Sequence, residues 1–171
     1  MAINVRFFKE GLLRAIPLLA LVYICISEFH TQFYLWDIFS FNIQFIIIYY
    51  WILRDPSILG YGFVFLCGLI NDVVLSLPLG TSPLAYLFVS LVAAYVRNAT
   101  VRSTLFTDWF TFIIAVLVGN FIVYFLLNNF SEFSVDYGSL FFNSLFTFIL
   151  YPAFWVIFEL YRRYINLRMY D

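Results

Sequence analysis

The segment that decides the class of this protein runs from Leu105 to Leu127 and reads LFTDWFTFIIAVLVGNFIVYFLL. Its single charged residue is Asp108. A helix needs about 20 predominantly apolar residues to cross the hydrocarbon core of a bilayer. The rest of the chain is similar, because 64% of its 171 residues are hydrophobic and only 11% are charged. A water-soluble domain carries about 25% charged residues. The sequence therefore predicts an integral membrane protein with a single transmembrane domain over residues 1–171.

Several further apolar segments of this kind predict a bundle of about six transmembrane helices. Helices are expected because backbone N–H and C=O groups inside the lipid must be hydrogen-bonded within the protein, and the edge of an open sheet would leave such groups without partners. Asp55-Pro56 and Ser82-Pro83 are typical of helix starts, with a capping side chain before a proline in the first turn. The fold class is therefore an all-α integral membrane bundle. Its expected helices cover residues 12–35, 38–53, 56–77, 83–96, 105–127 and 139–161.

The basic residues indicate how such a bundle is oriented. With six spans, the N-terminus, the turn at Arg54, the loop 97–102 and the C-terminal tail all lie on one side. These segments contain all nine lysine and arginine residues of the chain. Because loops rich in lysine and arginine stay in the cytoplasm, both termini are expected to be cytoplasmic. No block of basic residues indicates nucleic-acid binding.

Polar residues inside the predicted helices need an explanation, because an ionisable group at membrane depth costs about 2.5–3.5 kcal/mol on insertion scales. Counting about 1.5 Å per residue from the cytoplasmic helix ends places polar residues of four helices at one level near the periplasm. One interpretation is that they hydrogen-bond to each other and lock the bundle. The other is a polar cavity or partner-docking site that opens toward the periplasm. These residues are Glu28, His30, Asn71, Asp72, Asn120 and Asn143.

Two further acidic residues lie close to cytoplasmic helix ends. We expect Asp108 to pair with Arg102, and Glu159 to pair with Arg162 or Arg163, at the membrane interface. Their expected role is structural.

Other conspicuous side chains are expected to serve packing. Cys25 and Cys67 fall inside apolar segments, where thiols behave as small hydrophobic groups, and no disulfide is expected. Tyr49, Tyr50 and Trp51 are expected near a membrane interface, which favours amphipathic rings.

The sequence contains no set of residues typical of an enzyme active site. His30 is the only histidine, so a metal site would lack a second imidazole. Glu28 and His30 are two positions apart, which places them about 200° apart around a helix. The sequence has no Ser–His–Asp set and no glycine-rich phosphate loop. We therefore expect no catalytic residues, no cofactor and no metal site.

The most distinctive motif is a predicted helical hairpin, with Gly68-Leu69-Ile70-Asn71-Asp72 on the first helix. Gly68, Asn71 and Asp72 share one helical face, and Gly68 allows a neighbouring backbone to approach closely beside the carboxylate. Pro78 and Gly80 then stop the helix and form a tight turn. A purely structural interpretation is a well-made hairpin with a carboxylate near its turn. Small residues four apart, which suit close helix packing, occur at Ser90/Ala94 and Ala115/Gly119.

This hairpin resembles the signature region of the rod shape-determining protein MreD family. In that family a Gly-x-x-x-Asp helix leads into a Pro-Leu-Gly turn and another apolar helix. The matching residues are Gly68, Asp72, Pro78, Leu79 and Gly80. The specific motif covers only this region, whereas the resemblance in topology covers the whole chain.

The resemblance implies a non-catalytic role in the bacterial machinery that elongates the lateral cell wall. The protein would lie in the bacterial inner membrane, in contact with membrane lipid. MreC would be its most direct partner. The MreB filament and the glycosyltransferase and transpeptidase that synthesise peptidoglycan would be indirect partners. The fold would be akin to the substrate-binding subunits of energy-coupling-factor transporters, and the polar level would be an inherited pocket or a dock for MreC.

Two other functions remain open at this point. The first is a substrate-binding membrane subunit of a vitamin or small-molecule transporter. Such subunits carry an Ala-x-x-x-Ala face on their first helix, whereas Ala15 and Ala20 are five positions apart here. The second is an unrelated membrane scaffold or assembly factor. A neighbouring cell-shape gene would favour the MreD-like function, and a neighbouring pair of ATPase genes would favour the transporter.

Overall fold

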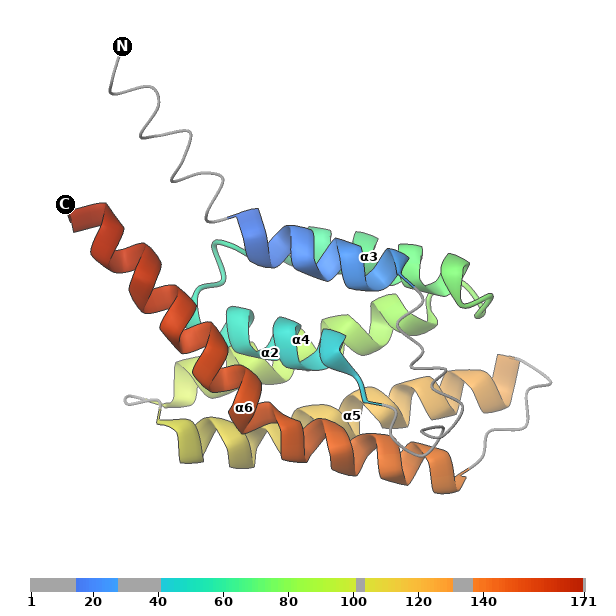
Figure 1. Cartoon of the computed structure of the whole chain (residues 1–171). Coiled ribbons are helices and arrows are strands. Elements are labelled where there is room, and N and C mark those ends of the chain that lie inside the picture. Colours follow the sequence, from blue (N-terminus) through green and yellow to red (C-terminus); the bar gives the residue numbers. More distant parts are fainter. Residues whose placement is uncertain (1–14, 28–40, 101–103, 131–136, 171) are drawn as a thin grey trace, which may run out of the picture.

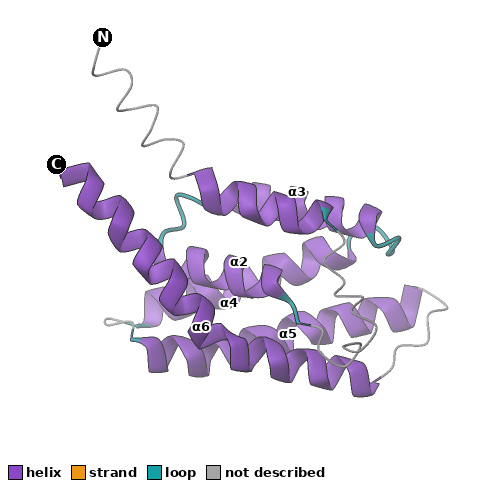
Figure 2. Cartoon of the chain, viewed as in Figure 1, coloured by secondary structure: helices purple, strands orange, loops and turns teal. Residues whose placement is uncertain are grey.

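The computed structural model describes residues 15–27, 41–100, 104–130 and 137–170, and these ranges are entirely helical apart from turns (Figures 1 and 2). The prediction of an all-α fold is therefore confirmed for the described residues. The first helix covers Ala15–Ile26. The others are α2 (Ile43–Arg54), α3 (Tyr61–Val74), α4 (Thr81–Ala99), α5 (Leu105–Phe130) and α6 (Tyr137–Tyr170).

The helices form a layered bundle in which α2 and α4 lie at the centre. The first helix and α3 lie on one side, and α5 and α6 lie on the other (Figure 1). Helix α4 packs on α2, α3 and α5. Every residue of α2 from Phe45 to Leu53 is buried. A helix that is apolar all round is stable in this central position, where each face meets another helix.

The burial of α2 corrects one prediction. Tyr49, Tyr50 and Trp51 are fully buried in the core, so their rings contact neighbouring helices and do not face the boundary between lipid and water, as was expected of amphipathic rings. Their rings pack on aromatic residues of α5 and α6, with Tyr49 against Phe112 and Trp51 against Phe158. Aromatic content alone does not distinguish a core position from an interfacial one.

The start of α3 also differs from the prediction. Asp55-Pro56 is expected to begin this helix, but α3 begins only at Tyr61. The Asp55 carboxylate instead accepts hydrogen bonds from the backbone N–H and the hydroxyl of Ser57, and so stabilises a turn. An aspartate before a proline is favoured in turns as well as at helix starts.

The remaining helices overlap the predicted ranges but end elsewhere. Helix α2 begins at Ile43, not at 38, and residues 38–40 lie outside the described ranges. Helices α4, α5 and α6 extend beyond the predicted ranges, and α6 continues to Tyr170. Apolar residues mark only the part of a helix that is buried in protein or lipid, whereas the backbone hydrogen bonds of the helix can continue beyond that part. Of the predicted first helix, residues 12–14 and 28–35 lie outside the described ranges.

Two of the described helices are long and apolar enough to cross a membrane, namely Leu105–Asn129 and Leu140–Ile165. Helices α2 and α3 are also apolar but have only 12 and 14 residues. They are roughly 18 and 21 Å long at 1.5 Å per residue. This is less than the roughly 30 Å of a hydrocarbon core.

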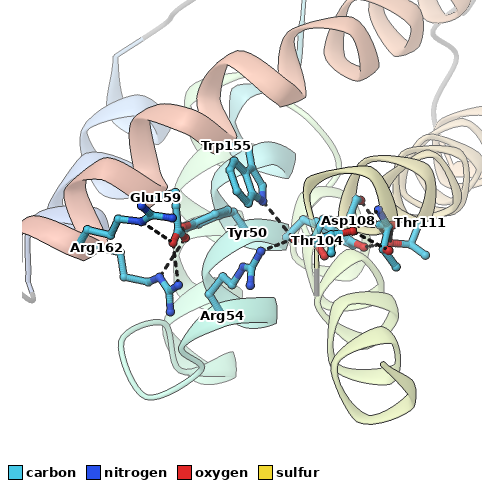
Figure 3. A network of polar contacts seen from close by, with 11 residues as sticks. Tyr50, Arg54, Thr104, Asp108, Thr111, Trp155, Glu159 and Arg162 are labelled. Carbon is cyan, nitrogen blue, oxygen red and sulfur yellow. Dashed lines mark hydrogen bonds and ion pairs between the residues drawn. The ribbon is translucent and has the colours of Figure 1, made fainter. Parts of the chain in front are cut away.

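The two ends of the bundle differ in charge. Arg54 is the last residue of α2 and Arg97 lies in the last turn of α4. Both helices end at the same end of the bundle, opposite the turn between α3 and α4 (Figure 1). Arg162 lies near Arg54, at what we call the arginine end (Figure 3), and Arg163 contacts Glu159 beside it. The opposite end is called the turn end.

Candidate functional site

The carboxylate of Asp72 fixes the turn between α3 and α4. Its Oδ2 accepts a hydrogen bond from the backbone N–H of Gly80 at 2.7 Å, and its Oδ1 accepts one from the N–H of Ser82 at 2.8 Å. Asp72 is fully buried. The start of a helix has backbone N–H groups without intrahelical partners, and an anionic acceptor stabilises them. Asp72 therefore caps α4 from the preceding helix.

The neighbouring motif residues also stabilise the turn between α3 and α4. Asn71 donates from Nδ2 to the Ser82 hydroxyl at 2.9 Å. Gly80 has a φ of 105°, which glycine adopts without strain. A Cβ atom on Gly68 would lie 2.6 Å from the backbone N and Cα of Pro83. The predictions of a close approach at Gly68 and of a tight turn at Gly80 are both confirmed.

Leu79 is the motif residue that faces outward. It lies at the tip of the turn, and 74% of its surface is exposed. The carboxylate of Asp72, by contrast, is buried with both oxygens bonded to backbone N–H groups. In this arrangement Asp72 positions the turn, and Leu79 is the side chain that the turn presents.

The other predicted polar residues form a separate row between α2, α5 and α6. Asn120 accepts a hydrogen bond from Asn42 Nδ2 at 3.3 Å and donates to the Ser144 hydroxyl at 2.6 Å. The Asn42 N–H donates to the Thr147 hydroxyl, which in turn donates to the Asn143 carbonyl. Asn71 and Asp72 thus bond within the hairpin, whereas Asn120 and Asn143 join three other helices.

Two predicted candidates, Glu28 and His30, lie outside the described residues. Cys25 and Cys67 are both free and buried, and their side chains interact across the first helix and α3. Within the described ranges, no group of three or more His, Cys, Asp or Glu residues is arranged to hold a metal ion.

A second polar network lies at the arginine end, where Arg54 of α2 reaches Asp108 of α5. Arg54 Nη2 lies 2.6 Å from Asp108 Oδ2, and Trp155 Nε1 of α6 donates to the same oxygen at 3.0 Å. The guanidinium also lies 5.5 Å from the centre of the Trp155 ring. Figure 3 shows these side chains converging from three helices. Arg102, the partner expected for Asp108, lies outside the described residues.

Glu159 of α6 occupies a neighbouring position in this network (Figure 3). It accepts hydrogen bonds from both Nε and Nη2 of Arg162, and one from Arg163 Nε at 3.3 Å. The prediction that it pairs with Arg162 or Arg163 is confirmed. The Tyr50 hydroxyl of α2 donates to the same carboxylate at 3.0 Å. Tyr50, Arg54 and Trp155 were not predicted, because their roles depend on how α2 and α6 are rotated about their axes.

Both networks join different helices through side-chain hydrogen bonds and ion pairs, and at the arginine end Arg54 Nε is buried without a hydrogen-bond partner. Breaking one partner of a buried ion pair leaves an uncompensated charge, so such pairs fix how helices are arranged. No family model, curated protein or solved structure matches this chain. Its function is therefore inferred from its own residues and geometry.

Proposed function

We propose that this chain is a multi-pass membrane protein whose six helices form one bundle in the bilayer, in which α5 and α6 are long enough to span the full hydrocarbon core. The supporting observation is the outer surface of α5, where large apolar side chains are exposed from Phe106 to Phe125. These positions span roughly 28 Å along the helix axis at 1.5 Å per residue. The hydrocarbon core of a bilayer is roughly 30 Å thick.

Helix α6 supports the same proposal. Its exposed apolar side chains extend from Phe141 to Leu160, again roughly 28 Å along the axis. Meanwhile Asp72, Asp108 and Glu159 are buried inside the bundle. A monomeric soluble protein rarely exposes large contiguous apolar surfaces while burying its carboxylates. Lipid around the bundle accounts for both observations.

The proposed orientation places the arginine end in the cytoplasm and the turn end on the periplasmic side of the bacterial inner membrane. The positive-inside rule supports it, because the described arginines Arg54, Arg97, Arg162 and Arg163 belong to the arginine end. Both termini are cytoplasmic in this orientation.

The proposed function is that of a non-catalytic component of the cell-wall elongation machinery, similar to MreD. The observation that carries it is the α3–α4 hairpin, in which Asp72 caps α4 and Gly68 contacts Pro83. These are the residues that resemble the MreD signature, and here they act together as one rigid turn. MreC is the proposed direct partner at the turn end. MreB and the glycosyltransferase and transpeptidase are indirect partners.

A scaffolding role suits the chemistry of the described carboxylates. Asp72 is engaged by backbone N–H groups, and Asp108 and Glu159 are engaged by arginines. A group held in this way stabilises packing.

Depletion of the protein in its native host tests this function. Rounded cells with delocalised wall synthesis are the expected result, whereas intact rods would contradict it. Saturable binding of a vitamin by the purified protein would also contradict it and favour a transporter subunit.

Association with MreC tests the proposed partner. Asp72→Ala should weaken co-purification of MreC, because the turn loses the acceptor that holds its backbone. Asp55→Ala is the matched control, because Asp55 stabilises a turn at the opposite end of the bundle. Membrane level and insertion of each variant are measured alongside. Unchanged MreC association in Asp72→Ala, with normal cell shape, would refute the docking proposal.

A further inference from the structure

Helix α6 is longer than a bilayer requires. It has 34 residues and is therefore roughly 51 Å long, against roughly 30 Å for a hydrocarbon core. The exposed apolar side chains from Phe141 to Leu160 already cover a bilayer length, and the helix continues to Tyr170. Pro152 lies inside the helix, where proline causes a kink. The C-terminal part of α6 consequently runs obliquely to α5 (Figure 1).

The exposed face of this extension mixes apolar and cationic side chains. Leu160, Arg163, Tyr164 and Leu167 are all exposed, and their spacing of three and four places them on one side of the helix. Leu167 is 70% exposed although it lies beyond the arginines. If this part of α6 extended into water, an exposed leucine at position 167 would not stabilise it. Leucine and tyrosine suit the apolar boundary of a bilayer, and an arginine beside them can lay its stem along that surface while its guanidinium reaches the headgroups.

The opposite face of the extension is attached to the bundle, which fixes its rotation. Ile165 is buried, and Tyr161 packs edge-on against Trp51 of α2. Arg162 binds Glu159 of the same helix, which in turn accepts a hydrogen bond from Tyr50 of α2. Arg163 makes a single long contact with Glu159, at 3.3 Å, and its side chain is 70% exposed. Its guanidinium therefore retains N–H donors on the exposed side.

We infer that residues 160–167 form a surface segment that lies on the anionic leaflet at the arginine end, where Arg163 binds the phosphate of an anionic phospholipid. Guanidinium matches phosphate geometry, and a lysine or arginine near an anionic leaflet contributes about 1 kcal/mol. Leu160, Tyr164 and Leu167 supply the apolar contact with the lipid. This inference rests on the proposed membrane assignment.

The test uses the full chain in a Cys25→Ala/Cys67→Ala background, reconstituted in vesicles. An environment-sensitive NBD probe is attached at Leu167→Cys, and its quenching by neutral acrylamide is measured. Vesicles contain phosphatidylcholine alone or a mixture with phosphatidylglycerol. The same probe at Leu117→Cys, within the exposed stripe of α5, is the lipid reference. The probe at Ser57→Cys, in a polar exposed turn, is the aqueous reference.

The 167 probe should be shielded and blue-shifted with phosphatidylglycerol, and more accessible in phosphatidylcholine alone. With phosphatidylglycerol present, Arg163→Gln should lower the ratio of membrane-bound to unbound 160–167 segment by about fivefold, which is the factor for losing one cation near an anionic surface. Arg163→Lys should keep most of the effect. A 167 probe as accessible as the one at Ser57, or an Arg163→Gln variant that matches the parent, would overturn the inference. Loss of every variant from vesicles at pH 11 would instead contradict the membrane assignment itself.

Discussion

Replacing Gly68 by alanine should destabilise the protein, whereas the same change at Gly62 should not. Both glycines lie on α3. A Cβ atom at Gly68 would lie 2.6 Å from two backbone atoms of Pro83, and one at Gly62 would meet nothing within 4 Å. The backbone at Pro83 cannot move aside freely, because the preceding residue is bound to Asp72. The clash can therefore be relieved only by shifting α3 from α4.

The two contributions to each variant have opposite signs. Alanine in place of glycine stabilises a helix by up to about 1 kcal/mol. Overpacking a tight contact costs about 1–3 kcal/mol, and the upper value applies here because the opposing atoms are backbone. The net loss for Gly68→Ala is then about 2 kcal/mol. At about 2–4 °C per kcal/mol for a chain of this size, the unfolding midpoint should fall by roughly 4–8 °C. The midpoint of Gly62→Ala should stay level or rise by a few degrees.

The buried thiols provide the assay. Cys25 and Cys67 are each about 1% exposed, so a thiol-reactive coumarin dye becomes fluorescent only as the bundle opens. Melting curves of the parent and both variants are recorded in the same detergent. A Gly68→Ala midpoint equal to or above that of the parent would refute the close contact between α3 and α4. A fall of similar size in Gly62→Ala would show that the assay does not report this contact.

Three further changes test other contacts. Asp72→Asn should lower the unfolding midpoint by several degrees, because the backbone N–H of Gly80 or of Ser82 then faces an amide N–H₂ group and loses its acceptor. An unchanged midpoint would contradict the capping of α4 by Asp72. Arg54→Gln should destabilise by about 3–5 kcal/mol, because it leaves the buried Asp108 carboxylate without its cation. Asp108→Asn should cost less, because the Arg54 side chain is 13% exposed. The double variant should cost clearly less than the sum of the two, and additive effects would argue against the ion pair. A membrane-permeant oxidant should join Cys25 and Cys67 in a disulfide within one chain, which mass spectrometry detects. If both thiols stay free after full treatment, the packing of the first helix on α3 is contradicted.

The sequence was informative where the relevant contact is local. Apolar segments predicted the helices, and Pro78 and Gly80 predicted the turn that follows α3. Gly68 predicted a close approach because it shares a helical face with Asp72 and has no side chain to keep a neighbouring backbone away. The helices and the turn depend on residues within about one or two helical turns, where spacing determines geometry, and the contact of Gly68 with Pro83 lies within a single hairpin.

The remaining features depend on contacts between distant segments. Counting depth along each helix placed Asp108 near an arginine but could not show that the partner is Arg54, 54 positions earlier in the chain. It also could not show that Tyr50 points toward Glu159, because rotation of α2 about its axis decides that contact. The central position of α2 follows from how six helices pack together. Hydropathy reports only that a segment is apolar, and lipid and protein cores are both apolar.

Accessibility of two single cysteines in intact cells tests the central claim, the membrane bundle with its arginine end in the cytoplasm. Leu79→Cys lies at the exposed tip of the α3–α4 turn, and Ser57→Cys lies in the exposed turn between α2 and α3. A membrane-impermeant maleimide should label Leu79→Cys from outside, and should label Ser57→Cys only after the cells are opened. Labelling of both positions in intact cells, or of Ser57→Cys alone, would contradict the proposed arrangement.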